Sequence, residues 1–179
     1  MATGTLMTAE QFDRLPAVEG RKSELLEGEL VELSSATLLH NYILLILGTT
    51  LVPVLSRLRL GVAVPNTEFI FGDSRFQPDL AVLLGDKWKH WDLERVPVDL
   101  TPEIAVEVIS PSESATHVER KTRIYLEHGV AEVWCIYPDD RRVYIHRQDS
   151  IRMLKEDETL STPLLPDWSV TVRDLFPVQ

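Results

Sequence analysis

Two acidic residues on neighbouring predicted strands give the strongest indication of chemistry in this sequence. Residues 76–84 and 103–111 are mostly apolar runs of strand length, each bounded by Pro or Gly. Side chains alternate along a strand, so Asp79 and Glu107 each share a face with apolar neighbours. If the strands pair antiparallel, the start of the first lies beside the end of the second and the two carboxylates meet. Adjacent carboxylates in an apolar sheet are unfavourable unless a cation or a shared proton relieves them. The spacing leaves two interpretations open, a metal site or two acids solvated at strand ends.

The residue types narrow the chemistry of such a site. The five histidines show no metalloprotease spacing, and one cysteine cannot build a zinc knuckle. The sequence has neither a Gly-rich phosphate loop nor a Gly-x-Ser-x-Gly elbow. Carboxylate oxygens prefer Mg²⁺ or Mn²⁺ to zinc. Such an ion can activate water and stabilise the charge that develops during phosphodiester hydrolysis.

The order of elements predicts one α/β domain over residues 1–179, with a mixed, largely antiparallel central sheet flanked by helices. Residues 8–11 have the spacing of a capping box that begins a short helix. Residues 23–33 are typical of a tight hairpin. A long helix is expected over residues 36–59, kinked or ended near Pro53. Further predicted elements are strands at residues 62–64, 68–71, 132–137 and 142–146, a helix at 114–128 ended by Gly129, and an irregular apolar tail at 161–176.

Composition places the chain among soluble proteins. Hydrophobic residues make up 44% and charged residues 26%, the usual balance of a globular domain. No signal-peptide pattern opens the sequence. The longest apolar stretch, residues 36–55, contains polar residues and Pro53, so we expect a buried helix and no membrane association. The single Cys135 lies in an apolar strand, where we expect it in the core, and it is compatible with a reducing cytoplasm.

The charge distribution bears on nucleic-acid binding. The net charge of −10 argues against an indiscriminate nucleic-acid coat protein. Residues 112–152, however, hold seven basic and seven acidic side chains, so all the excess acid lies elsewhere. This segment could form a local phosphate-facing patch, or it could be a solvated surface of mixed charge.

The paired acids and the motifs around them resemble a known family. Pro78-Asp79 followed by Glu107 is similar to the Pro-Asp … Asp/Glu-x-Lys core of restriction-type nucleases. The wider pattern resembles the bacterial Uma2 family, also called DUF820, over nearly the whole chain. Besides Lys121 with Tyr125, the matching segments are residues 7–12 (MTAEQF), 24–30 (ELLEGEL), 77–79 (QPD), 106–112 (VEVISPS), 129–134 (GVAEVW) and 162–166 (TPLLP). Each motif is weak alone, and their ordered combination is fairly specific.

The resemblance implies a restriction-endonuclease-like fold and a set of site residues. Asp79 and Glu107 would be catalytic metal ligands for Mg²⁺ or Mn²⁺, together with the backbone carbonyl of Val108. Glu24 matches an acidic position that completes some of these sites, although a hairpin surface charge would look the same in sequence. His40 matches a histidine at the start of the long helix, either near the metal or as a hydrogen-bonded packing residue.

Two positions depart from the family pattern. Ile109 stands where the strand lysine is expected, and it cannot stabilise a phosphate or orient a water. The family generally supplies that charge from the next helix, where Lys121 fits the role; it could also be a surface lysine beside its arginine neighbours. His117 replaces a usual acidic residue one helical turn before Lys121. Weakened or absent activity would follow if these changes matter.

We therefore expect a cytoplasmic, Mg²⁺-dependent endonuclease acting on DNA, with Asp79, Glu107, Lys121 and Glu24 at its catalytic site. A catalytically silent binding or assembly module on the nuclease fold is the alternative. Residues 85–102 are too long for a simple turn and carry Trp88 and Trp91. These tryptophans indicate a homodimer interface, or they pack onto their own domain.

Overall fold

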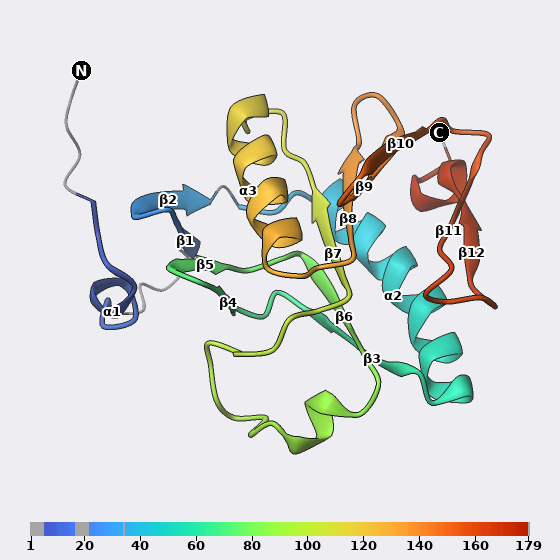
Figure 1. The fold of residues 1–179 in the computed structure, drawn as a ribbon. Helices are drawn as coiled ribbons and strands as arrows, with labels where there is room; N and C mark the ends of the chain where they lie inside the picture. Colours follow the sequence, from blue (N-terminus) through green and yellow to red (C-terminus); the bar gives the residue numbers. More distant parts are fainter. Residues whose placement is uncertain (1–5, 17–21, 34, 179) are drawn as a thin grey trace.

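A twisted six-stranded sheet forms the centre of the protein (Figure 1). The computed structural model describes residues 6–16, 22–33 and 35–178. The strand order is β10-β9-β8-β7-β6-β3, and only β7 and β8 run parallel. The strands are β3 (Gly61–Pro65), β6 (Leu80–Leu84), β7 (Ile104–Val108), β8 (Glu132–Tyr137), β9 (Arg142–Arg147) and β10 (Ser150–Leu154).

Two smaller sheets complete the fold. A four-stranded antiparallel sheet has the order β2-β1-β5-β4 and lies at the N-terminal end of the molecule, after the short helix α1 (Ala9–Phe12). Near the C-terminus, β11 and β12 pair beside the central sheet, so the tail is more regular than the sequence predicts. The bounds are β1 (Lys22–Leu26), β2 (Glu29–Leu33), β4 (Phe69–Phe71), β5 (Ser74–Phe76), β11 (Thr159–Ser161) and β12 (Ser169–Thr171).

Helix α2 (Leu38–Leu58) covers one face of the central sheet. Thr37 caps its N-terminus by accepting the His40 N–H at 3.1 Å. The helix buries one residue per turn against the sheet, namely Ile43, Leu47, Leu51 and Leu55. The sequence predicts that the helix is kinked or ends near Pro53. In the structure the helix continues through this residue to Leu58. Among the described residues, α2 alone is long and apolar enough to cross a membrane by length and composition, a test that core helices of soluble proteins also pass.

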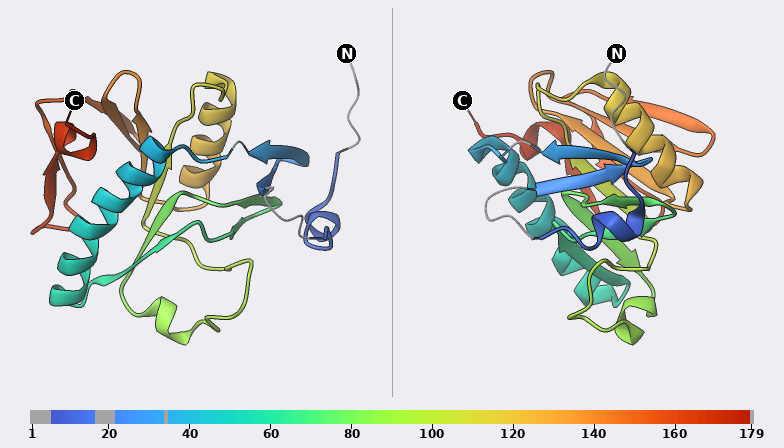
Figure 2. Two further views of the ribbon diagram at one scale, coloured as in Figure 1. Left: turned by 180° about the vertical axis from the view of Figure 1, so that it is seen from behind. Right: turned by 90° about the vertical axis from the view of Figure 1, so that its left-hand side faces the viewer.

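Helix α3 (Ala115–Glu127) lies on the opposite face of the central sheet, as both views in Figure 2 show. It connects the parallel strands β7 and β8, which a short turn cannot join. Ser114 accepts the His117 N–H and caps the helix. Its inner face packs on a second core cluster that also contains Phe71 and Phe76 from the N-terminal sheet. The site therefore lies where α3, the central sheet and the N-terminal sheet meet.

The loop between β6 and β7 holds the tryptophans of the predicted interface. It contains the short 3₁₀ helix η1 (Lys87–His90). Trp88 and Trp91 are partly buried and pack against the core cluster beneath α3. The Trp91 indole N–H donates to the Arg95 carbonyl at 3.2 Å. These contacts agree with packing onto their own domain, and a homodimer through this loop stays a prediction.

A buried glutamate ties β8 to the C-terminal segment. Glu132 is 2% exposed and accepts hydrogen bonds from three side chains. Trp134 Nε1 donates at 2.8 Å, Arg147 donates from Nε and Nη2 at 2.9 and 2.8 Å, and Thr162 Oγ1 donates at 3.0 Å. Trp134 in turn stacks on Trp168 with ring centroids 5.2 Å apart. Glu132 is therefore a buried charge that is fully compensated.

We predict that Glu132→Gln lowers the free energy of unfolding by about 2–4 kcal/mol, because Arg147 loses its buried counter-charge and the new amide N–H group faces other donors. Urea denaturation followed by circular dichroism would measure the loss. Glu156→Gln is the matched control, since Glu156 pairs with Arg141 at the surface and its loss should cost about 1 kcal/mol or less. Equal losses in the two variants would contradict the assignment of Glu132.

Candidate functional site

The strand register places Asp79 and Glu107 beside each other. Strands β6 and β7 are antiparallel, and Leu80 pairs with Val106. Asp79 directly precedes β6, so it continues the register next to Glu107. Asp79 Oδ2 accepts the backbone N–H of Val108 at 2.8 Å, which ties the start of one strand to the end of the other. The meeting of the two acids that alternation predicts is therefore present in the structure.

His40 contacts Asp79 from the other layer. It lies in the first turn of α2, and its Nε2 is 3.0 Å from Asp79 Oδ1. Both carboxylate oxygens of Asp79 thus have a partner, one from the neighbouring strand and one from α2. The structure shows a direct contact between the side chains of His40 and Asp79, and a role of His40 near a metal stays a prediction.

Lys121 is a buried residue between two carboxylates. Its Nζ lies 2.9 Å from Glu24 Oε1 and 2.9 Å from Glu107 Oε1. Its side chain is 7% exposed. Its neighbours Arg120 and Arg123 instead pair at the surface with the acids Glu27, Glu29 and Glu127. The surface interpretation of Lys121 is wrong, and these two arginines are already neutralised by acids.

Glu24 joins the cluster from β1 of the N-terminal sheet. It is 1% exposed, which rules out a hairpin surface charge. Oε1 accepts the Gln77 backbone N–H at 2.7 Å as well as the Lys121 ammonium. Oε2 is buried and has no hydrogen-bond partner among the described residues. One oxygen of Glu24 is therefore free to bind a cation or a water.

Tyr125 contacts the same cluster one turn after Lys121. Its hydroxyl donates to Glu107 Oε1 at 2.6 Å, and its ring is fully buried. The ring packs edge-on against Phe71 and Phe76 with centroids 4.9 and 5.2 Å away. The sequence alone assigns Tyr125 no separate role. Its position four residues after Lys121 does indicate that both side chains lie on one helix face.

Burial dominates the electrostatics of the cluster. Burial raises the pKa of Glu107 to about 8, with Lys121 acting in the opposite direction and with Asp79 and Glu24 adding to the rise. Burial would lower the pKa of Lys121, but the Glu107 and Glu24 carboxylates outweigh it, so the pKa lies above its ordinary value. Burial also raises the pKa of the Tyr125 phenol. Lys121 stays charged while Glu107 titrates.

The remaining predicted residues lie at or beside the cluster. Val108 follows Glu107 in β7 and is buried. Ile109 is 7% exposed and packs in the core, so it supplies no charge. His117 lies in the first turn of α3, and no group in the described part of the chain forms a hydrogen bond with its buried Nε2. The structure brings together Glu24, Asp79, Glu107, Lys121 and His40.

The donor set suits a hard cation in type. Glu24, Asp79 and Glu107 offer carboxylate oxygens as metal ligands. Among them, Glu24 Oε2 accepts no hydrogen bond from the described residues. In the part of the chain that the structure describes, however, no three His, Cys, Asp or Glu side chains gather closely enough to hold one metal ion. Lys121 fills the position between Glu24 and Glu107. The residues thus supply oxygen ligands of the right type, and a bound ion would share the cluster with this ammonium.

A mixed, largely antiparallel sheet with helices on both faces, and paired acids on adjacent strands, defines the restriction-endonuclease-like α+β class. The profile of the Uma2 family, described as "Putative restriction endonuclease", matches residues 9–173, and the chain belongs to this family. It is also similar to a crystal structure described as "a putative nuclease belonging to DUF820 from Anabaena variabilis ATCC 29413". That similarity has a TM-score of 0.80 and 24% identity, over 95% of this chain and 97% of the other. The search of curated proteins gave no match.

We predict that the metal-free protein loses stability relative to Glu107→Gln as pH rises from about 4.5 to about 8. The folded pKa of Glu107 is raised, so the folded state holds a proton that the unfolded state has released, and rising pH favours unfolding. The difference in unfolding free energy should fall by up to about 1.4 kcal/mol per pH unit. Urea denaturation in EDTA at several pH values would measure it, and a constant difference would contradict the shift.

We predict that Tyr125→Phe raises the pKa of Glu107 further, because the lost hydroxyl donates a hydrogen bond that favours the charged carboxylate. Carbon-13 NMR of labelled glutamate carboxylates would follow the titration. Tyr144→Phe is the control, since that ring packs on Tyr137 and lies in β9, two strands away from β7. An unchanged or lower Glu107 pKa in Tyr125→Phe would refute the role of the hydroxyl.

Proposed function

We propose that this protein is a Mg²⁺-dependent endonuclease that hydrolyses phosphodiester bonds of DNA in the bacterial cytoplasm. Membership of the Uma2 family supports the nuclease class. The single observation that carries the proposal is the buried cluster in which Lys121 bridges Glu24 and Glu107 beside Asp79. Charged groups of this kind are costly to bury, and structural stability alone gives little reason to retain them.

The metal would be held by Asp79 and Glu107 with the Val108 carbonyl, and Glu24 would support it through its free Oε2. Mg²⁺ or Mn²⁺ fits these oxygen donors. When bound, the ion supplies stabilisation of the negative charge that develops on the phosphate. In our proposal His40 and the Val108 N–H hold the Asp79 carboxylate, and Tyr125 holds Glu107 Oε1.

Lys121 would supply the positive charge that Ile109 lacks. Its ammonium already contacts two carboxylates, and a lysine has three donors. The third donor is available for a phosphate oxygen or for the attacking water. The raised pKa of Lys121 keeps the group charged, so it would act as an electrostatic stabiliser and not as a proton acceptor.

The first test is metal binding. Titration calorimetry with Mg²⁺ and Mn²⁺ should show binding to the wild type that Asp79→Ala and Glu107→Ala abolish. Mutating either residue removes a charged ligand, and circular dichroism would verify that each variant is folded. A folded wild-type protein that binds neither ion would overturn the proposed metal dependence.

The second test is cleavage of supercoiled plasmid in the presence of Mn²⁺. Lys121→Ala should lower the nicking rate by about 10²- to 10³-fold, the usual effect of removing one stabilising donor. Lys89→Ala is the matched control, because Lys89 is an exposed lysine that pairs with Asp86 on η1, and its activity should equal that of the wild type. Equal nicking by the Lys121 and Lys89 variants would exclude a role for Lys121.

A catalytically silent binding or assembly module is the second candidate. The observation that favours it is that the Lys121 ammonium already lies between the Glu24 and Glu107 carboxylates, the position that a bound cation would otherwise take. Under this alternative the wild type would leave plasmid intact with either ion. Metal-dependent nicking that is lost in Lys121→Ala would eliminate it.

A further inference from the structure

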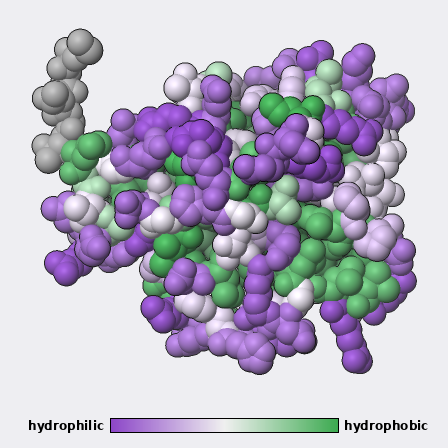
Figure 3. All heavy atoms as spheres, in the orientation of Figure 1, coloured by the Kyte–Doolittle hydropathy of each residue, from purple (hydrophilic) through white to green (hydrophobic). Residues whose placement is uncertain are grey.

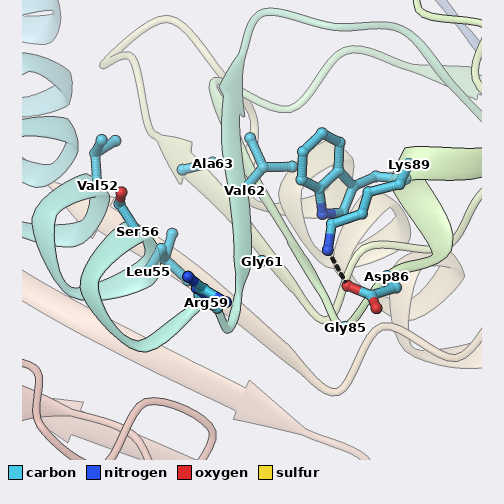
Figure 4. Close-up of a pocket in the computed structure, with 11 residues that line it drawn as sticks. Val52, Leu55, Ser56, Arg59, Gly61, Val62, Ala63, Gly85, Asp86 and Lys89 are labelled. Carbon is cyan, nitrogen blue, oxygen red and sulfur yellow. Dashed lines mark hydrogen bonds and ion pairs between the residues drawn. The ribbon is translucent and has the colours of Figure 1, made fainter.

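The outer side of α2 carries an apolar stripe that no part of the described chain covers. Leu38, Leu45 and Val52 are 88%, 60% and 48% exposed. They are spaced by seven residues, so they lie along one side of the helix, in the spacing by which one helix packs against another. The stripe ends at a hollow of about 360 Å³ between α2, β3 and η1, where Val52 lies on the α2 wall (Figure 4).

The stripe is uncharged on a strongly acidic protein. Residues 37–56 contain no Asp, Glu, Lys or Arg, and the one histidine, His40, contacts Asp79. By contrast, hydrophilic residues predominate over α3 and the β1–β2 hairpin (Figure 3). With a net charge of −10, two copies repel each other across most surfaces. The outer side of α2 can meet its own copy without placing like charges together.

Gly48 gives an independent indication of a close neighbour. A glycine inside a helix costs about 1 kcal/mol relative to alanine. A Cβ at Gly48 would meet nothing within 4 Å, so packing inside the described chain gives no reason for a glycine there. Small residues on a helix surface allow another backbone or a bulky side chain to approach.

The stripe is symmetric about Leu45, with Leu38 seven residues before it and Val52 seven after. We propose that α2 packs antiparallel against α2 of a second copy, across a two-fold axis at Leu45. Each Leu38 then lies against Val52 of the other copy, and the partly exposed Gly48 lies on the flank of the stripe, where the other helix approaches. A self-complementary patch of this kind closes as a dimer. The proposal does not depend on nuclease activity, and it moves the interface from the Trp88–Trp91 loop to α2.

The decisive experiment changes Leu45, which lies on the two-fold axis and therefore contacts Leu45 of the other copy. Leu45→Glu and Leu45→Arg should each be monomers, because each places two like charges together. Their equimolar mixture should recover the dimer, because Glu then faces Arg. Sedimentation velocity from about 5 to about 200 µM would report the mass of each sample. Recovery in the mixture is a result that unfolding or a remote effect cannot produce.

Ile151→Glu is the matched control, since Ile151 is 66% exposed on β10, and this variant should dimerise like the wild type. A wild type that stays monomeric throughout the concentration range would overturn the proposal, as would a mixture of the two Leu45 variants that fails to pair. Flotation with vesicles of phosphatidylcholine and phosphatidylglycerol tests the other apolar occupant. Lipid binding by the wild type that Leu45→Glu abolishes, with no dimer in solution, would also overturn it.

Gly48→Ala separates helix stability from dimer contact. Alanine should raise the thermal midpoint of the dilute monomer, because it favours the helix. The same change should weaken the dimer at least about tenfold, because its methyl group takes up space into which the other helix packs. An unchanged or tighter dimer in Gly48→Ala would contradict the proposed close approach.

Discussion

The contact of the Lys121 ammonium with Glu24 and Glu107 is the interaction on which the site depends. Each group is almost fully buried, and each alone would be an uncompensated charge in an apolar interior. The contact also joins three layers, because Glu24 comes from the N-terminal sheet, Glu107 from the central sheet and Lys121 from α3. The relative placement of these layers is therefore coupled to the charge balance of the cluster.

Asp79 is held by two contacts that do not involve Lys121. The Val108 N–H reaches it within the sheet, and His40 reaches it from α2, the helix on the other face. The carboxylates thus lie where every layer of the fold contributes at least one partner. Glu24, Glu107, Lys121 and His40 lie on strands or helices, and Asp79, which directly precedes β6, is held by two contacts, an arrangement that favours electrostatic preorganisation.

The sequence predicts some parts of the site because their periodicity is strict. Alternation on two short strands is enough to pair Asp79 with Glu107, and the structure has that register. Helical periodicity is less decisive in α3, where Arg120, Lys121 and Arg123 are adjacent cations. Only the folded structure shows that the Lys121 side chain points inward while the two arginines pair with surface acids. The same holds for Glu24, whose hairpin neighbours Glu27 and Glu29 point outward.

Local rules also fail where tertiary burial outweighs them. Pro53 does not end its helix: α2 continues to Leu58, in agreement with the helix expected over residues 36–59, with Leu51 and Leu55 buried on either side of the proline. The sequence predicts an irregular tail because each of its strands is only three residues long. Pairing between β11 and β12, with Trp168 stacked on Trp134, supplies the order that local sequence does not.

The chain separations within the cluster imply an order of assembly. Glu107 and Lys121 lie on consecutive elements, so they can meet as soon as β7, α3 and β8 form one unit. Glu24 lies 97 residues before Lys121, and closing that larger loop costs more chain entropy. The first carboxylate to meet the lysine is therefore the local one, and the distant one arrives when the N-terminal sheet docks. The contact between Lys121 and Glu24 thus forms late in folding, and a Lys121 that contacts both carboxylates marks a chain whose layers have all come together.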